Sequence, residues 1–221
     1  MTESELIPFV SLESRRPRRP VRASGIARYE SLLDALEELL TRKETEEIGL
    51  PELARVADAP VASVYHFFPE MSAALVALAE RYMDRFVEMM EQPFDMARVG
   101  SWEDLLVQAS ERSREYYNAH PVVLKLILGP DQSWSIREMD LQNNRRLARF
   151  FLAACAKHFE FPTSDSLVAV FEVAITMNDA VWSLSYARHG SITDAFAREA
   201  QRAVRGYLRG YLPAFAPIRR R

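Results

Sequence analysis

The sequence predicts an all-α protein, and three observations support this fold class. Apolar residues recur three and four positions apart in most segments, which is the spacing of an amphipathic helix. Prolines and short Ser/Thr-x-x-Glu/Asp strings, which begin helices, divide the chain at regular intervals. The 221 residues include only 7 glycines, and the absence of Asn-Gly and Asp-Gly pairs argues against β-hairpins.

The N-terminal segment, residues 1–23, is expected to form a flexible, arginine-rich arm. Pro17 and Pro20 lack the N–H donor and bias the residues before them away from helix. Ser24 is then expected to cap a first helix over about residues 25–42, because apolar side chains follow it at i, i+3 and i+7.

Two short helices and a long one are expected next. Gly49 precedes a short helix over residues 50–57, residues 58–60 form a turn, and a second short helix covers residues 61–68. Pro69 ends that helix, and an amphipathic helix follows over about residues 71–91.

The rest of the chain is expected to hold four longer helices. Capping boxes at residues 101–104, 135–138 and 191–194 predict helix starts, with ends near residues 119, 159 and 212. Residues 162–164 begin the remaining helix, which ends near Gly190.

Overall composition favours an intracellular protein. The single cysteine, Cys155, excludes an internal disulfide, and no apolar signal-peptide core is found near the N-terminus, so we expect a cytoplasmic location. Glu172, Asn178 and Asp179 interrupt the most apolar segment, so we expect no membrane-spanning helix and no membrane partner.

The segment "LPELARVADAPVASVYHFFPEMSAAL" resembles the helix-turn-helix signature of the tetracycline-repressor (TetR) family of bacterial transcription regulators. The resemblance covers about residues 25–90, and the length and helical order extend it to the whole chain. It implies a DNA-binding domain over residues 24–69 and a ligand-binding and dimerisation domain over residues 70–221. The sequence departs from the family pattern at four positions, where it has Asp58, Pro60, Phe67 and Met71.

Double-stranded DNA is therefore an expected partner. The arm gathers five cations upstream of the first helix, where arginines suit a narrow, negative minor groove. At the second short helix, Ala62 and Ser63 lie where side chains reach base edges, and the resemblance implies a phosphate contact for Tyr65. The DNA-binding candidates are Arg15, Arg16, Arg18, Arg19, Arg22, Ala62, Ser63, Tyr65 and His66. The alternatives are a disordered tail that aids solubility, a half-buried core role for Tyr65 and an ordinary surface role for His66.

Aromatic residues and methionines are dense in the C-terminal two thirds, which favours a cavity for a small, largely apolar effector. Within the segment after Ser164, Asp179 falls on a polar stripe, whereas Asn178 lies in line with Phe171 and Trp182 and needs hydrogen-bond partners if buried. The ligand-binding candidates are Phe86, Met90, Trp102, Tyr116, Trp134, Phe171, Asn178 and Trp182. For any one of them, plain core packing is the alternative.

The last two helices resemble the family's dimerisation pair, so we expect a homodimer with two-fold symmetry. The candidate interface residues are Phe196, Ala203, Tyr207, Gly210 and Tyr211, which share one face of the final helix or its extension.

No catalytic or metal-ligating arrangement is evident, since the four histidines are scattered and no glycine-rich phosphate loop is present. We therefore expect no enzyme, no cofactor and no metal site. The prediction is a ligand-responsive, homodimeric transcriptional repressor acting on a palindromic operator. Two alternatives stay open: an all-α small-molecule binding protein whose helix-turn-helix is degenerate, and a small helical enzyme.

Overall fold

A computed structural model describes residues 16–130, 132–160, 164–213 and 216. These residues form helices and no β-strand, which confirms the all-α prediction. They divide into two compact units, residues 1–78 and residues 79–221, and the boundary lies inside helix α4, Met71–Met90.

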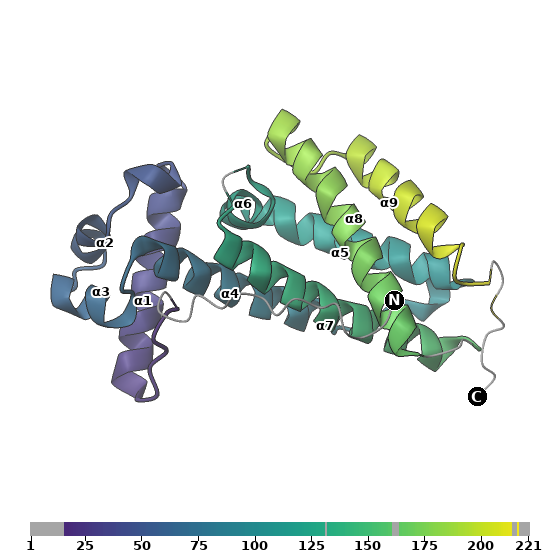
Figure 1. The fold of residues 1–221 in the computed structure, drawn as a ribbon, viewed down its shortest axis with the longest axis horizontal. Helices are drawn as coiled ribbons and strands as arrows, with labels where there is room; N and C mark the ends of the chain where they lie inside the picture. The colour runs from purple at the N-terminus through teal and green to yellow at the C-terminus, as the bar shows by residue number, and fades with distance from the viewer. Residues whose placement is uncertain (1–15, 131, 161–163, 214–215, 217–221) are drawn as a thin grey trace, which may run out of the picture. The chain divides into compact units, whose positions relative to one another are not determined.

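The first unit is a small helical bundle. It contains α1 (Ala23–Leu40), a single 3-10 turn (Thr45–Glu47), α2 (Leu50–Val56), α3 (Val61–Phe67) and the first part of α4. Helix α2 packs against both α1 and α3. The core consists of side chains that recur at helical spacing and are fully buried: Leu32, Leu36, Leu53, Val64 and Phe68. The sequence-predicted order of helix, short helix, turn, short helix and long helix is therefore present (Figure 1).

The turn between α2 and α3 is built around a residue in the left-handed region. Asp58 has a φ of 47°, at the position where the family pattern has glycine. Aspartate tolerates this conformation better than most residues because its short polar side chain can hydrogen-bond locally. The next residue returns to the bundle, since the Ala59 amide donates to the carbonyl of Ala54 at 3.0 Å.

The second unit consists of antiparallel helices around one core. It contains α5 (Trp102–Ala119), α6 (Pro121–Val123), a π-helical turn (Leu124–Leu128), α7 (Trp134–His158), α8 (Asp165–His189) and α9 (Asp194–Leu208). A 3-10 turn, Met96–Arg98, precedes α5. Helix α8 packs against α7 on one side and α9 on the other, and α9 also contacts α5 (Figure 1). The short α6 and the π-helical turn were not anticipated from the sequence.

Helix starts agree with the sequence in some places and differ in others. The Ser101 capping box is present, and α8 ends at Gly190 in the left-handed conformation. Two predicted caps are wrong, because Ser133 rather than Ser135 caps α7 and Thr193 rather than Ser191 caps α9. Helix α1 also begins one residue after Arg22, without a side-chain cap from Ser24.

Tertiary contacts explain the late start of α9. The buried Ser185 hydroxyl accepts from the Thr193 amide at 3.0 Å and donates to the Ser191 carbonyl at 2.8 Å. On the other side, the Asn118 side chain bonds both the amide and the carbonyl of Ile192. These bonds hold residues 191–193 in extended form, so the helix cannot begin at Ser191.

The apolar character of α8 also exceeds the sequence expectation. By length and composition alone, α8 could cross a membrane, with a mean hydropathy of 1.5 over its best stretch. Among the described segments, the bent pair α3 and α4 meets the same criterion only when it is taken as one span. Core helices of globular proteins share this composition, and α8 here packs against α7 and α9.

The Asp58 turn yields a stability prediction. Because Cβ crowding makes the left-handed region costly for branched side chains, Asp58→Val should lower the free energy of unfolding by about 1–2 kcal/mol. Asp58→Gly should change it by less than about 1 kcal/mol. Urea unfolding monitored by circular dichroism measures both. Equal losses of stability in the two variants would show that the carboxylate, rather than the backbone angle, holds the turn.

Candidate functional site

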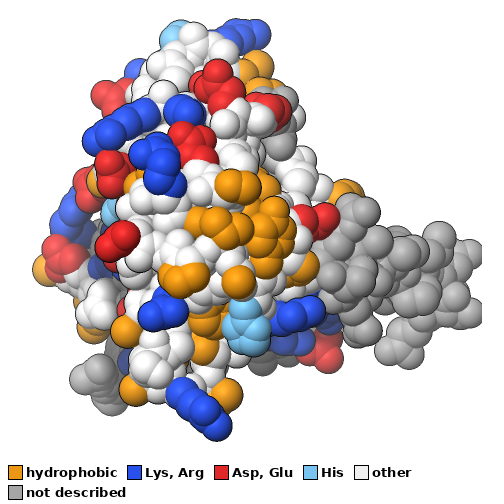
Figure 2. Space-filling view, turned by 90° about the vertical axis from the view of Figure 1, so that its left-hand side faces the viewer, with side chains coloured by type: hydrophobic (Ala, Val, Ile, Leu, Met, Phe, Trp, Pro, Cys, Tyr) orange, Lys and Arg blue, Asp and Glu red, His pale blue; other side chains and the backbone are white. Residues whose placement is uncertain are grey.

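Helix α3 presents one side to solvent and buries the other. Val61 and Tyr65 are 45% and 48% exposed, and Ala62 and His66 are exposed as well. We call these four residues the reading surface. Figure 2 shows the corresponding face of the molecule, where hydrophobic side chains gather beside a histidine and Lys or Arg side chains flank them. The exposed side of α3 is thus mostly apolar, with cations around it.

The buried side of α3 accounts for one departure from the family pattern. Phe67 is 6% exposed and meets the ring of Tyr29 edge-on, with ring centroids 5.6 Å apart. Tyr29 also contacts the ring of Phe68 at 5.1 Å. The phenylalanine at this position therefore joins α3 to α1 through aromatic packing, and the helix-turn-helix remains intact.

The sequence analysis did not predict a cation that lies next to α3. The guanidinium of Arg28, on α1, donates to the Ser63 hydroxyl at 3.5 Å. Arg28 is exposed and directly precedes the buried Tyr29. The sequence offered a signal for this contact, because Arg28 directly precedes Tyr29, a core residue that packs against α3.

The described part of the arm, residues 16–22, is attached to the bundle. The Arg18 amide donates to the Phe67 carbonyl at 2.9 Å, at the C-terminal end of α3. The side chains of Arg16, Arg18, Arg19 and Arg22 are exposed, whereas Arg15 lies outside the described residues. One backbone hydrogen bond thus joins this stretch to the end of α3, and the flexibility of the arm stays a prediction.

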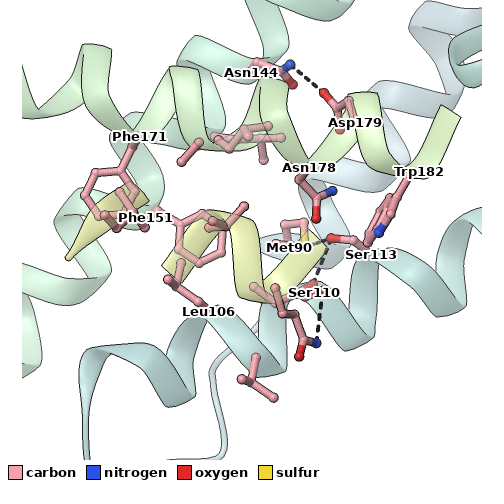
Figure 3. A pocket seen from close by; sticks show the side chains of 18 of the residues that line it. Met90, Leu106, Ser110, Ser113, Asn144, Phe151, Phe171, Asn178, Asp179 and Trp182 are labelled. Carbon is pink, nitrogen blue, oxygen red and sulfur yellow. Dashed lines mark hydrogen bonds between the residues drawn. The ribbon is translucent and has the colours of Figure 1, made fainter. Parts of the chain in front are cut away.

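The second unit contains a cavity of about 100 Å³ between α4, α5, α7, α8 and α9. Five of the eight ligand-binding candidates line it: Phe86, Met90, Phe171, Asn178 and Trp182. The walls are largely apolar, and Figure 3 shows Phe151 and Phe171 on the side away from the polar groups.

Three candidates do not line the cavity. Trp102 is fully buried, and its indole N–H donates to the Pro213 carbonyl at 3.0 Å. Tyr116 turns away and donates to the Tyr82 carbonyl at 2.7 Å, while its neighbour Tyr117 faces the cavity. Trp134 begins α7 and is 55% exposed. Aromatic character alone does not say which way a side chain points.

The sequence analysis missed or misplaced some of the polar residues at one end of the cavity. Asp179, expected on an outward stripe, is 7% exposed and accepts a hydrogen bond from Asn144 at 2.8 Å. Asn178 is half-buried and projects toward the cavity, as Figure 3 shows. We call Asn144, Asn178, Asp179 and Trp182 the polar end of the cavity. The available signal was a polar residue in α7 and another in α8 at positions that meet when the helices pack. Using this signal requires knowing that α7 and α8 pack together.

A second buried carboxylate lies on α7. Asp140 is 2% exposed and pairs with the Arg137 guanidinium at 2.9 Å. Burial, and then the charge of Asp179, raise the pKa of Asp140 to about 8. Burial likewise raises the pKa of Asp179 to about 6, against the opposing effect of the Asn144 hydrogen bond. Burial and the same two carboxylates raise the pKa of Tyr117 well above its ordinary value.

The outer surface of α8 and α9 carries exposed apolar side chains. Val173 and Leu184 on α8 are each 45% exposed, and Tyr211 is 54% exposed. Of the other dimer candidates, Phe196, Ala203 and Tyr207 are half-buried, and Gly210 is exposed just beyond the end of α9. Arg188 and His189 of α8 lie against the ring of Phe196, whereas Val173, Leu184 and Tyr211 keep about half of their surface exposed.

The fold and the two regions define a helix-turn-helix unit joined to a helical unit with a partly open cavity. Residues 100–211 match the family described as "Tetracyclin repressor-like, C-terminal domain". This match covers half of the chain, and the protein therefore belongs to the tetracycline-repressor family of transcriptional regulators.

Curated relatives match over part of their length. The transcriptional regulator AcuR of Cereibacter sphaeroides is 31% identical over 87 residues, which are 39% of this chain and 40% of AcuR. The HTH-type transcriptional regulator AlkX of Mycobacterium tuberculosis is 28% identical over 107 residues, which are 48% of this chain and 50% of AlkX. The chain thus spans half or less of the length of these relatives.

Solved structures match over most of the chain and support the fold. A TetR-family transcriptional regulator from Streptomyces coelicolor has a TM-score of 0.64 at 21% identity, covering 85% of this chain and 98% of that one. SmeT, the repressor of the Stenotrophomonas maltophilia multidrug efflux pump SmeDEF, has a TM-score of 0.59 at 16% identity, covering 84% and 91%.

The buried carboxylates yield a pH prediction. Both pKa values lie above the ordinary 3.8, so the folded state binds more protons than the unfolded state between about pH 4 and pH 8, and stability falls as pH rises through this window. Asp179→Asn removes one titrating carboxyl group and its repulsion of the Asp140 carboxylate. Between pH 5 and pH 8, the free energy of unfolding of the variant should therefore fall by roughly 2 kcal/mol less than that of the wild type.

Urea unfolding at the two pH values measures this difference. Glu172→Gln, on the same helix but outside the cavity lining, is the matched control and should follow the wild type. An Asp179→Asn protein that loses as much stability as the wild type would show that Asp179 does not titrate in this window.

Proposed function

We propose that the protein is a ligand-responsive transcriptional repressor that binds a palindromic operator as a homodimer. The observation that carries this proposal is the exposed side of α3, which follows a tight turn from α2 and is flanked by arginines. In helix-turn-helix proteins the second helix enters the major groove and contacts base edges with its first residues. Val61 and Ala62 hold those positions here.

The contacts available to the reading surface are of two kinds. Val61 and Ala62 offer methyl groups that match thymine methyls, and Ser63 offers a hydroxyl that donates or accepts. The Tyr65 hydroxyl and the Arg28 guanidinium are suited to phosphates, since both can donate to an oxygen. Arg28 adds a cation beside Ser63, whereas the chain has Met71 at the start of α4, where the family pattern has lysine.

The arm supports the same function. The hydrogen bond from Arg18 to Phe67 holds residues 16–22 at the C-terminal end of α3, so less conformational entropy is lost when the arm meets DNA. Exposed arginines at this place neutralise phosphates or enter the adjacent minor groove.

A homodimer follows from the uncovered surface of α8 and α9. Exposed Val173, Leu184 and Tyr211 are removed from water when a second copy packs on them. Two-fold symmetry then presents two α3 helices to half-sites about one turn of DNA apart, or a multiple of that distance.

The cavity supports the regulatory part of the proposal. Phe86 and Met90 of α4 line it, and the same helix continues back into the DNA-binding unit. A small, largely apolar ligand that binds one position of α4 more tightly than another shifts the balance between DNA-binding and released states.

Selection of binding sites from random duplex DNA with the full-length protein tests the proposal. The expected result is a palindromic motif with half-sites about one helical turn apart. If only salt-sensitive binding without a motif is recovered, the alternative takes over: a small-molecule binding protein with a degenerate helix-turn-helix.

The arm yields a prediction about salt. Replacing Arg16, Arg18 and Arg22 by alanine should weaken operator binding and make the slope of log affinity against log salt shallower by about 0.9 for each phosphate that the arm no longer neutralises. Fluorescence anisotropy at several salt concentrations measures the slope. Arg198→Ala, in the other unit, is the control. An unchanged slope in the triple variant would assign the arm no role on DNA.

A second prediction concerns Tyr65. Tyr65→Phe keeps the ring but removes the hydroxyl, so operator affinity should fall by about 3- to 10-fold while thermal stability stays unchanged. The exposed ring makes a folding defect unexpected, because Tyr65 contributes little to the core. If stability falls and affinity does not, Tyr65 is a structural residue.

A further inference from the structure

The effector cavity has a distinct polar end, formed by Asn144, Asn178, Asp179 and Trp182. Asn144 comes from α7 and the other three from α8, and Figure 3 shows the ring of Phe151, which is also on α7, apart from them. The other walls are mostly apolar, but Ser110, Ser113, Gln201 and Arg205 on α5 and α9 also line the cavity. A ligand that fills the cavity therefore needs an apolar body, and a polar group where it reaches Asp179 and Trp182.

Asp179 forms no direct ion pair with any described residue. Its carboxylate accepts from the Asn144 amide, and hydrogen bonding from Asn178 and the charge of Arg137 also favour its ionised form. The guanidinium of Arg137, on the facing helix α7, is paired with Asp140 instead. Buried carboxylates are normally paired with a cation, because removing an ion from water costs free energy. Two carboxyl groups thus share one arginine, and only Asp179 borders the cavity.

Trp182 provides a second, independent sign of a ligand. It lies three residues after Asp179 on α8, which places both on one side of the helix. Its side chain is 1% exposed, and its indole nitrogen has no hydrogen-bond partner among the residues that the structure describes. Figure 3 shows the nitrogen on the side of the ring that faces Ser113. A buried N–H donor without an acceptor costs free energy that a bound oxygen atom removes.

We infer that the cavity binds an amphipathic cation: an apolar molecule whose polar end combines a protonated amine with a neighbouring oxygen, as in an amino alcohol. The ammonium group donates to Asp179, and the oxygen accepts from the Trp182 indole N–H. Aromatic rings of Tyr117 and Trp182 border the same space and favour a cation near their faces. This inference rests on the proposed function, because it names the effector class for the same cavity.

An anionic effector is disfavoured by the same geometry. A carboxylate at the polar end would meet the charge of Asp179. The one cation that lines the cavity, among the described residues, is Arg205 on α9, and its guanidinium lies 3.9 Å from the carboxylate of Glu103.

A set of four six-carbon probes tests the inference: 2-aminohexan-1-ol, hexan-1-amine, hexan-1-ol and hexanoate. Titration calorimetry on the full-length protein at pH 7 measures their affinities. The amino alcohol should bind most tightly, by at least about tenfold over hexan-1-ol, because a buried charge pair outweighs a neutral hydrogen bond. Equal or tighter binding of hexan-1-ol or hexanoate, or no binding by any probe, overturns the inference.

Two variants assign the contacts. Asp179→Asn retains an acceptor for Asn144 and should remove the preference for amines over alcohols. Trp182→Phe retains a ring but lacks the N–H, so it should weaken the amino alcohol by about 3- to 10-fold more than it weakens hexan-1-amine. Glu172→Gln is the control and should bind like the wild type. If Asp179→Asn keeps the preference for amines, the inference fails.

Proton release gives a readout that does not depend on the affinity of a variant. The ionisable groups that interact with Asp179 from neighbouring helices are Asp140, Arg137 and Tyr117, and Arg205 on α9 lines the same cavity. A cation at the polar end favours the ionised forms of both carboxyl groups, so binding at pH 7 should release protons. Repeating the titration in buffers of different ionisation enthalpy counts them, and proton uptake would contradict the inference.

These titrations contain no DNA, so they separate the two proposals. A recovered operator together with failed titrations leaves the regulator in place and removes this effector class. Amine binding without an operator motif supports the small-molecule binding protein.

Discussion

Helix α8 is apolar around most of its circumference, and the need to cover it organises the second unit. Helix α7 covers one side and α9 another, and side chains such as Phe171 and Trp182 are fully buried between them. Two sectors remain. One borders the cavity, and the other exposes Val173 and Leu184 at 45% each. The candidate effector site and the candidate dimer surface are thus different consequences of one helix that a single chain cannot cover completely.

A similar dependence on a few buried side chains is seen in the first unit. Tyr29, Phe67 and Phe68 form an aromatic cluster that joins α1 to the end of α3. The carbonyl of Phe67 also accepts the hydrogen bond that holds the arm. Phenylalanine at this position therefore packs in the core, and the exposed side of α3 is formed by other residues. Phe67 is one of the four departures from the family pattern, and its structural role is to support the helix-turn-helix.

The sequence predicted the helices better than it predicted which way individual side chains point. Helix order, the Asp58 turn and the Ser101 cap depend on local chemistry, which neighbouring residues determine. Five of eight ligand candidates reached the cavity because aromatic and methionine side chains on paired helices often face inward. Trp102, Tyr116 and Trp134 did not, since a rotation of about 100° per residue around a helix separates a lining residue from its neighbour. Tyr116 and Tyr117 illustrate this difference.

Periodicity and capping chemistry in the sequence determined that this protein is all-α and that two short helices joined by a turn precede a larger helical unit. These properties are local, so the chain carries them in short segments. Its membership of the tetracycline-repressor family rests instead on resemblance, in the segment over residues 50–75 and in the family match over residues 100–211. Tertiary structure alone decided that Asp179 turns inward to Asn144, that Ser185 and Asn118 delay the start of α9, and that Arg28 reaches Ser63. Each of these depends on residues 8 to 74 positions apart, whose proximity arises only when helices pair.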